Sequence, residues 1–175
     1  MDTKRDYFEV YTALSNWLTR YPRLITLLRL FNRFVVVVMY VAYLATLLGI
    51  IWLHRSSVVD AVKAVYPFIL VPGVGFVLLT WGRNYLSAPR PYEEWEIAPL
   101  IPREKQGDSL PSRHVFSATV ISLVVWRVAW PAGIALLVLT VLLALARVIG
   151  GVHYPRDVVA GILCGLICGA CLWLF

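Results

Sequence analysis

The sequence predicts an all-α membrane protein, a polytopic helix bundle of about five transmembrane helices preceded by an amphipathic interfacial helical segment. Of its 175 residues, 60% are hydrophobic and only 15% are charged, a balance far from that of a soluble domain. Apolar stretches of about 20 residues, the length that a bilayer core requires, recur along the chain. No linker rich in Ser, Gly or Pro separates a second domain. We therefore expect a surface segment at residues 1–33 and one transmembrane bundle at residues 34–175.

Residues 1–33 are predicted to form helices that lie on the membrane surface. Phe8, Tyr11 and Leu18 recur at helical spacing between polar residues, which is the pattern of an amphipathic helix. A second helical piece follows Pro22 and is interrupted by arginines. Because each arginine costs about 2.5 to 3.5 kcal/mol at the centre of a bilayer, we expect this piece also to stay among the lipid headgroups. The arginines in question are Arg20, Arg23, Arg29 and Arg33.

Five apolar segments are expected to cross the membrane. The first of them, residues 34–53, contains no charged side chain. In the last one, Gly161, Gly165 and Gly169 repeat at four-residue intervals, and such a stripe of small residues lets another helix approach closely. We interpret the stripe as packing inside the bundle, with a homo-oligomer contact as the alternative. The predicted spans lie near residues 34–53, 64–81, 112–128, 131–147 and 158–175.

Alternation of these spans places two polar segments on the same face of the membrane. Residues 82–113 form a long charged loop after the second span, and residues 147–157 form the turn before the last span. Pro111 suits the first turn of the helix that follows it. The free backbone N–H groups near Ser112 and Arg113 would then point into the loop. Such a helix start is a ready anion site.

The formal net charge of +6 indicates lipid or phosphate as the partner. The basic residues lie between apolar runs rather than on a soluble basic face, so nucleic acid is a poor partner, whereas anionic lipid is a good one. Most of the Lys and Arg residues fall on the side of the two polar segments, which leaves Arg55, Lys63 and Arg127 opposite. The positive-inside rule then places the polar segments in the cytoplasm. We expect no metal at the three cysteines of the last span, because thiolate ligands need a polar environment.

The two polar segments together supply residues suited to phosphate chemistry. His153 can act as a nucleophile that Asp157, four residues later, orients. His114, from the other segment, is left as the acid that protonates the departing oxygen. The three glutamates within residues 93–96 are expected to form a solvated or arginine-balancing face. Arginine offers paired N–H donors to a phosphate, and the arginines suited to this task are Arg83, Arg90 and Arg147.

At these residues the chain resembles the type 2 phosphatidic acid phosphatase superfamily of membrane lipid phosphatases. Residues 83–91 match the family motif of a lysine, six residues and Arg-Pro, with arginine in place of the lysine. Residues 111–114 match Pro-Ser-Gly-His, with arginine in place of the glycine. Residues 146–157 match Ser-Arg, five residues, His, three residues and Asp, with alanine in place of the serine. The order and the spacing hold throughout, and the resemblance extends from Arg83 to the C-terminus.

The resemblance implies a metal-independent phosphatase without a cofactor. In such an enzyme His153 becomes phosphorylated, Asp157 supports it and His114 protonates the leaving group. The amide of residue 113 helps to bind the phosphate. The Arg113 side chain, which stands where the family has glycine, either points away or becomes an extra phosphate or diphosphate contact. Members of the family usually have six spans, and bacterial members usually face outward, which opposes the charge argument for a cytoplasmic site. The remaining phosphate ligands implied are Arg83, Arg90, Ser112 and Arg147.

We expect the protein to hydrolyse a membrane lipid phosphate or diphosphate at one face of the cell membrane. The candidate substrates are undecaprenyl diphosphate, phosphatidylglycerophosphate and phosphatidic acid. Two alternatives remain open. One is a lipid phosphotransferase that uses the same phosphohistidine, and the other is a non-catalytic protein that binds or transports a lipid phosphate.

Overall fold

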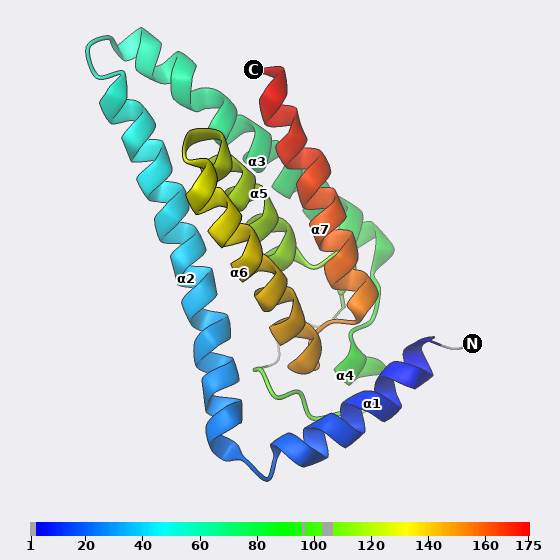
Figure 1. Ribbon diagram of the computed structural model, residues 1–175. Helices are drawn as coiled ribbons and strands as arrows, with labels where there is room; N and C mark the ends of the chain where they lie inside the picture. Colours follow the sequence, from blue (N-terminus) through cyan, green and yellow to red (C-terminus); the bar gives the residue numbers. More distant parts are fainter. Residues whose placement is uncertain (1–2, 96, 103–106) are drawn as a thin grey trace.

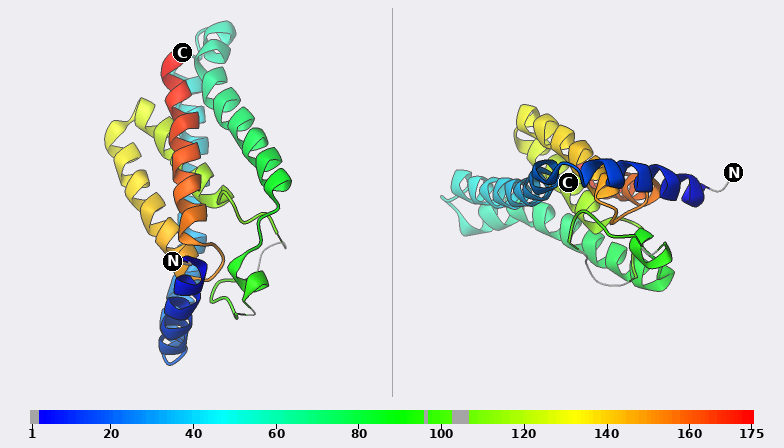
Figure 2. Two further views of the ribbon diagram at one scale, coloured as in Figure 1. Left: turned by 90° about the vertical axis from the view of Figure 1, so that its right-hand side faces the viewer. Right: turned by 90° about the horizontal axis from the view of Figure 1, so that it is seen from below.

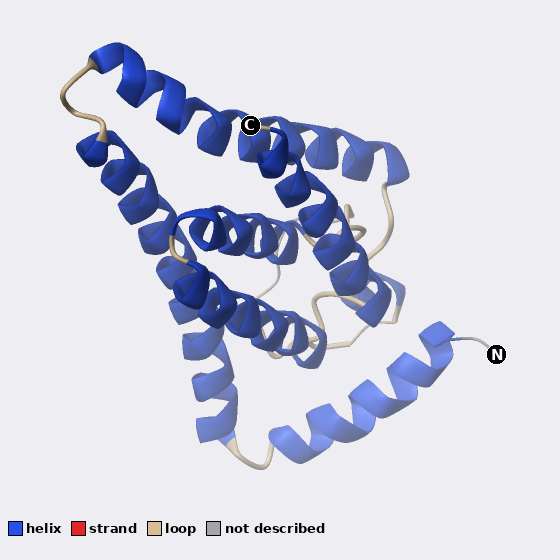
Figure 3. Ribbon diagram, turned by 45° about the horizontal axis from the view of Figure 1, so that its top comes forward, coloured by secondary structure: helices blue, strands red, loops and turns tan. Residues whose placement is uncertain are grey.

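The computed structural model describes residues 3–95, 97–102 and 107–175. Within these ranges helices are the only regular elements (Figure 3), which confirms the all-α prediction. A short 3-10 turn, η1, follows the last α-helix. The elements are α1 Thr3–Leu18, α2 Pro22–Leu53, α3 Val58–Leu86, α4 Pro91–Glu94, α5 Arg113–Val128, α6 Trp130–Ile149, α7 Pro155–Ala170 and η1 Cys171–Leu174.

Helix α5 is the centre of the bundle, and α2, α3, α6 and α7 surround it (Figure 1). Ten of its 16 residues are buried, including the polar Thr119 and Ser122. Their hydroxyls donate to backbone carbonyls four residues earlier, so they enter the core without leaving a donor unpaired. A helix of this length extends about 24 Å, which is shorter than the roughly 30 Å of a hydrocarbon core.

Four helices in the described part of the chain are long and apolar enough to cross a membrane. They are α2, α3 with its continuation to Glu94, α6, and α7 with η1. Four of the five expected spans therefore coincide with these helices. The fifth expected span, residues 112–128, is the buried central helix α5, whose neighbours separate it from the surroundings along most of its length.

The glycine stripe of α7 packs against α5. A Cβ atom at Gly161 would lie 2.8 Å from the Ser112 carbonyl oxygen, and one at Gly165 would lie 2.6 Å from the Thr119 Cβ. At Gly169 it would meet Leu123 in the same way. The glycines thus allow the two helices to touch along their backbones. An oligomer contact through the same glycines would have to displace α5.

The N-terminal segment differs from the prediction. Residues 22–33 are not a separate surface piece but the first turns of α2, which continues without interruption to Leu53. The 32 residues of α2 extend about 48 Å, well beyond a hydrocarbon core. The first turns can therefore hold their arginines at the interface while the helix stays intact. Arg29, for example, donates from Nε to the Leu100 carbonyl at 2.6 Å.

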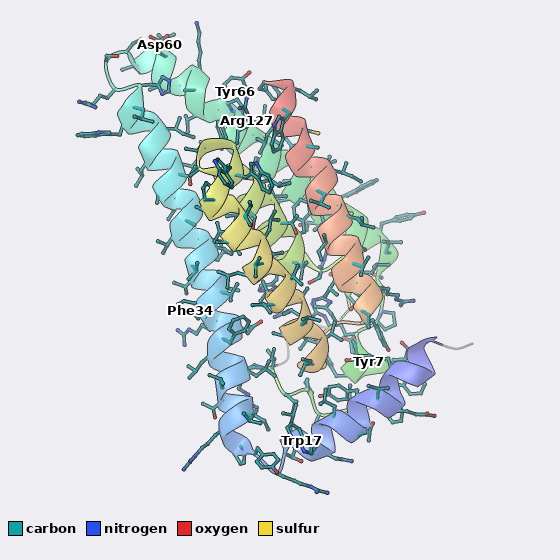
Figure 4. The ribbon with its side chains drawn as sticks, viewed as in Figure 1. Tyr7, Trp17, Phe34, Asp60, Tyr66 and Arg127 are labelled. Carbon is teal, nitrogen blue, oxygen red and sulfur yellow. The ribbon has the colours of Figure 1, made fainter. Side chains whose placement is uncertain are left out.

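Helix α1 is a separate helix that lies obliquely across one end of the bundle (Figure 2). Tyr7 and Trp17 lie at this end, whereas Asp60 and Arg127 lie at the opposite end (Figure 4). The inner face of α1 packs on the segment after α3, where Tyr11 joins Tyr92 in a buried cluster. We call the end that carries α1 the site end, because the predicted functional residues gather there.

Candidate active site

Three segments meet at the site end, as alternation of the spans predicted. The Ser112 amide donates to the Asp157 carbonyl at 2.9 Å, which joins the start of α5 to the start of α7. The Ser109 amide donates to the Ala88 carbonyl at 2.9 Å, and the Leu100 amide donates to the Gly150 carbonyl at 3.0 Å. Backbone hydrogen bonds therefore hold the loop after α3, the loop before α5 and the α6–α7 turn together.

His153 and Asp157 lie at the α6–α7 turn and are fully buried. Pro155 begins α7 and Asp157 occupies its third position, where a carboxylate is favoured by the helix dipole. The Asp157 Oδ2 atom accepts a hydrogen bond from the Tyr154 amide at 3.0 Å and lies 3.6 Å from His153 Nδ1. The Ser109 hydroxyl contacts both side chains, donating to Asp157 Oδ2 and lying 3.3 Å from His153 Nδ1.

His153 is held in its neutral form at neutral pH. Burial is the main cause that lowers the pKa of His153 from 6.5 to about 4, and the positive charges of Arg147 and Arg90 act in the same direction. The nearby Asp157 carboxylate opposes this shift only in part. A neutral imidazole keeps a lone pair for attack on an electrophile such as phosphorus.

The three arginines predicted to bind phosphate are all almost completely buried at this end. Arg90 donates from Nε to the Gly107 carbonyl at 3.1 Å and from Nη1 to the Val152 carbonyl at 3.5 Å. Arg83 donates to the carbonyls of Asp108 and Pro111, so it anchors the loop before α5 as well as lining the cavity. Arg147 lies in the last turn of α6, close enough to act electrostatically on His153.

The start of α5 faces the same region. The helix begins at Arg113 rather than at Pro111, so Ser112 is its N-cap residue. The first backbone N–H groups of a helix have no intrahelical partner and favour an anion. The Ser112 Oγ atom is buried and has no hydrogen-bond partner within the described residues. A hydroxyl in this state suits a bound phosphate oxygen.

Two cavities meet at Arg113 and His114. One is a polar cavity of about 480 Å³ that Arg83, Arg90 and Asp108 also line. The other is apolar, has a volume of about 210 Å³ and extends between α2 and α5. The Arg113 guanidinium lies 5.9 Å from the centre of the Phe76 ring, at the boundary between the two. The side chain that replaces the family glycine is thus accommodated beside the site.

Several residues that position the site were missed at the level of sequence. Glu93 was expected in a solvated or arginine-balancing face, and its carboxylate accepts from the amides of Arg90 at 2.8 Å and Gly107 at 2.7 Å. Glu94 accepts from the Tyr154 hydroxyl at 2.8 Å. Glu94 is exposed and Glu93 is only partly buried, so neither contradicts the expected face. What the sequence did not predict is the donor that each carboxylate finds. Glu96, the third glutamate, lies outside the described residues.

Tyr7 of α1 also reaches the site end. Its hydroxyl donates to the Val148 carbonyl at 3.0 Å, and its ring packs edge-on against Tyr154 at 5.1 Å between centroids. Burial raises the pKa of the Tyr7 hydroxyl, which remains a neutral donor. The amphipathic pattern predicted the helix but not this contact with the α6–α7 turn.

In the part of the chain that the structure describes, no group of three or more His, Cys, Asp or Glu side chains is arranged to hold a metal ion. The three cysteines are free thiols on α7 and η1. One of them, Cys168, donates weakly to the Val71 carbonyl on α3.

Residues 60–175, which contain all three site segments, match the sequence profile of the PAP2 superfamily. The chain belongs to the PAP2 superfamily. It is 29% identical over 127 residues to YbjG of Escherichia coli (strain K12), which carries the provisional name undecaprenyl-diphosphatase. That match covers 56% of this chain and 62% of YbjG, so it spans less than two thirds of the relative.

Two solved structures share this PAP2 fold. The crystal structure of Aquifex aeolicus LpxE gives a TM-score of 0.66 at 24% identity and covers 96% of this chain and 94% of LpxE. A PAP2-type phosphatidylglycerolphosphate phosphatase from Bacillus subtilis gives 0.55 at 19% identity, with coverage of 100% and 96%. Together with the four apolar helices, the family confirms the prediction of a multi-pass membrane protein.

Proposed function

We propose that this PAP2 protein hydrolyses a membrane lipid phosphate or diphosphate through a phosphohistidine, without a metal ion. The observation that carries the proposal is His153, a buried neutral histidine placed beside Arg90 and Arg147. Its Nε2 lone pair would attack phosphorus while the arginines compensate the charge on the phosphoryl oxygens. The bond between phosphorus and the departing oxygen breaks, and that oxygen leaves with its electron pair.

His114 would supply the proton for the departing oxygen, because it lines the polar cavity at the second position of α5. In the second step water attacks the phosphohistidine, and His114 takes a proton from that water. The bond from phosphorus to Nε2 then breaks. Inorganic phosphate is released and His153 returns to its neutral form. The Ser112 hydroxyl and the N–H groups at the start of α5 would hold the phosphoryl oxygens throughout.

The two adjoining cavities favour an amphiphilic substrate. A phosphate or diphosphate would occupy the polar cavity, and the first carbons of the lipid would enter the apolar cavity beyond His114. Undecaprenyl diphosphate, phosphatidylglycerophosphate and phosphatidic acid remain the candidates. The name of YbjG favours the first, and so does the additional guanidinium of Arg113 at the boundary.

The decisive experiment compares the purified protein with His153→Ala and with His54→Ala in detergent and chelator. His54 lies at the end of α2 opposite the site and contacts the Ile50 carbonyl, so it is a matched control. We expect phosphate release from a panel of lipid phosphates by the parent and by His54→Ala, and none by His153→Ala. Rapid acid-free quenching with labelled substrate should trap a phosphohistidine in the parent.

Three outcomes would contradict the proposal or narrow it. Full activity in His153→Ala would exclude this nucleophile. Loss of activity in chelator, restored by a divalent ion, would exclude the metal-independent reaction. Transfer of the phosphoryl group to an added alcohol, with little free phosphate, would identify a phosphotransferase instead.

A further inference from the structure

The Ser109 hydroxyl lies between His153 and Asp157. Its Oγ atom is within hydrogen-bond distance of both Asp157 Oδ2 and His153 Nδ1. The direct distance from Nδ1 to Oδ2 is 3.6 Å, which is longer than a normal hydrogen bond. The serine therefore connects the histidine to the carboxylate in addition to their direct approach.

The direction of these hydrogen bonds follows from the chemistry of the three groups. A carboxylate only accepts, so the single hydroxyl proton of Ser109 points to Asp157. The oxygen lone pairs of Ser109 then remain to accept from N–H at Nδ1 of His153. This arrangement fixes the imidazole tautomer with its proton on Nδ1 and its lone pair on Nε2.

We propose that Ser109 is a positioning residue that sets the tautomer and orientation of His153 on behalf of Asp157. The proposal rests on the proposed function, in which Nε2 of His153 attacks phosphorus. As the Nε2–P bond forms, positive charge develops on the ring. Ser109 keeps its bond to Nδ1–H and transmits the stabilisation of the Asp157 carboxylate, and no proton has to move between them.

The loop that carries Ser109 is clamped on several sides. The Ser109 amide is bound to the Ala88 carbonyl, and Arg83 donates to the carbonyls on either side, at Asp108 and Pro111. Ser109 itself has no exposed surface. The position of its hydroxyl is thus set by the backbone of the loop.

A matched control exists in the same protein. Ser122 is also fully buried, and its hydroxyl donates to the Ala118 carbonyl at 2.7 Å and lies 3.2 Å from Thr140 Oγ1. It lies in the middle of α5, away from the site. Ser122→Ala therefore removes a buried hydroxyl of the same kind without touching the α6–α7 turn.

The test measures kcat, KM and single-turnover formation of the phosphohistidine on one lipid phosphate. We expect Ser109→Ala to lower kcat and the rate of phosphohistidine formation on the order of 10- to 100-fold, by analogy with the loss of a hydrogen-bonded partner of a metal-ligating histidine. KM should stay within about threefold, because Ser109 does not bind substrate. Ser109→Thr, which keeps the hydroxyl, should restore most of the rate, and Ser122→Ala should match the parent.

The outcomes separate this inference from the proposed function. Wild-type kcat in Ser109→Ala, with His153→Ala inactive, would overturn the role of Ser109 and leave the nucleophile in place. Activity in His153→Ala would instead overturn the proposed function. If Ser109→Ala does not fold, Ser109→Cys keeps the size but donates weakly, and full activity in that variant would equally overturn the proposal.

Discussion

The protonation of His153 gives a quantitative prediction that involves no assumption about the lipid. Burial, helped by Arg147 and Arg90, lowers the pKa of His153 to about 4 from 6.5. At pH 5 a histidine with this pKa is about 90% neutral, whereas an unshifted one is only about 3% neutral. The difference in the attacking form is about 30-fold. We therefore expect kcat/KM to fall at acid pH with a midpoint near pH 4, where His153 of the free enzyme becomes protonated.

The chain has three histidines, so the group can be titrated directly. Protein labelled at histidine, in detergent and without substrate, should show three resonances that His→Asn variants assign. The His153 resonance should have its midpoint near pH 4. Arg156→Gln is the control, since Arg156 is half exposed and its guanidinium lies 3.6 Å from Asp157 Oδ1, whereas the charges that lower the pKa of His153 are those of Arg147 and Arg90. This variant should leave the midpoint in place, whereas Arg147→Gln should raise it.

Acid unfolding has to be separated from this titration. A lowered pKa means that the unfolded His153 binds a proton more readily than the folded one, so its contribution to stability is complete above pH 6.5 and is lost as the pH falls through about 4. Samples returned from pH 4 to neutral pH should regain full activity. A midpoint between pH 6 and 7 in folded protein would refute the reasoning, because it would show that the site leaves His153 as solvated as a free histidine.

Two further predictions concern packing and selectivity. Gly165→Ala places its Cβ 2.6 Å from the Thr119 Cβ and should lower the stability of the protein by about 1 to 3 kcal/mol. Gly73→Ala is the control, because its Cβ would have nothing within 4 Å, and it should change the stability by less than about 1 kcal/mol. Equal melting temperatures of the two variants in detergent would contradict this account of the α5–α7 contact. Arg113→Gly should lower kcat/KM for a prenyl diphosphate about 10- to 150-fold, which corresponds to the loss of one charge-assisted hydrogen bond of about 1.5 to 3 kcal/mol. The kcat/KM for the matching prenyl monophosphate should stay within about threefold of the parent value. Equal losses on the two substrates would exclude selection by Arg113.

The fold was predictable as far as it depends on apolar length. A charge-free run such as residues 34–53 is long enough to cross a bilayer as a helix, because a helix satisfies all of its backbone hydrogen bonds internally. The positions of the turns between such runs are indicated by charged residues and prolines. The continuity of α2 through residues 22–33 was not predictable in this way. Arginine near a helix end is compatible both with a surface helix and with a long helix that extends past the hydrocarbon layer. The choice depends on tertiary partners such as the Leu100 carbonyl, which accepts from Arg29.

The candidate site was predictable where the proposed chemistry requires rare residues. It costs free energy to bury ionisable side chains in a membrane protein unless they have a function. The presence and spacing of His153, Asp157 and the arginines therefore indicated a functional site. Ser109 and Glu93 are ordinary polar residues within the long charged loop that the sequence predicts at residues 82–113. Their roles arise from loops far apart in the chain, as in the bond from the Gly107 amide to Glu93. The sequence contains one local signal for Glu93. Arg90 directly precedes Pro91 and Glu93 follows Arg90 by three residues, which is the spacing of a capping box at a helix start.

Arg83, which stands where the family motif has lysine, holds the loop before α5 through its guanidinium. A lysine ammonium is a compact charge, whereas a guanidinium presents donors in a planar fork. Arg83 uses two separate nitrogens of this fork for the carbonyls of Asp108 and Pro111, and these two carbonyls bracket Ser109. The fork therefore fixes the same loop that delivers the Ser109 hydroxyl to His153. If Ser109 positions the nucleophile, Arg83→Lys conserves the charge of the family motif but loosens the support of this loop, so its defect should appear in kcat as well as in phosphate binding.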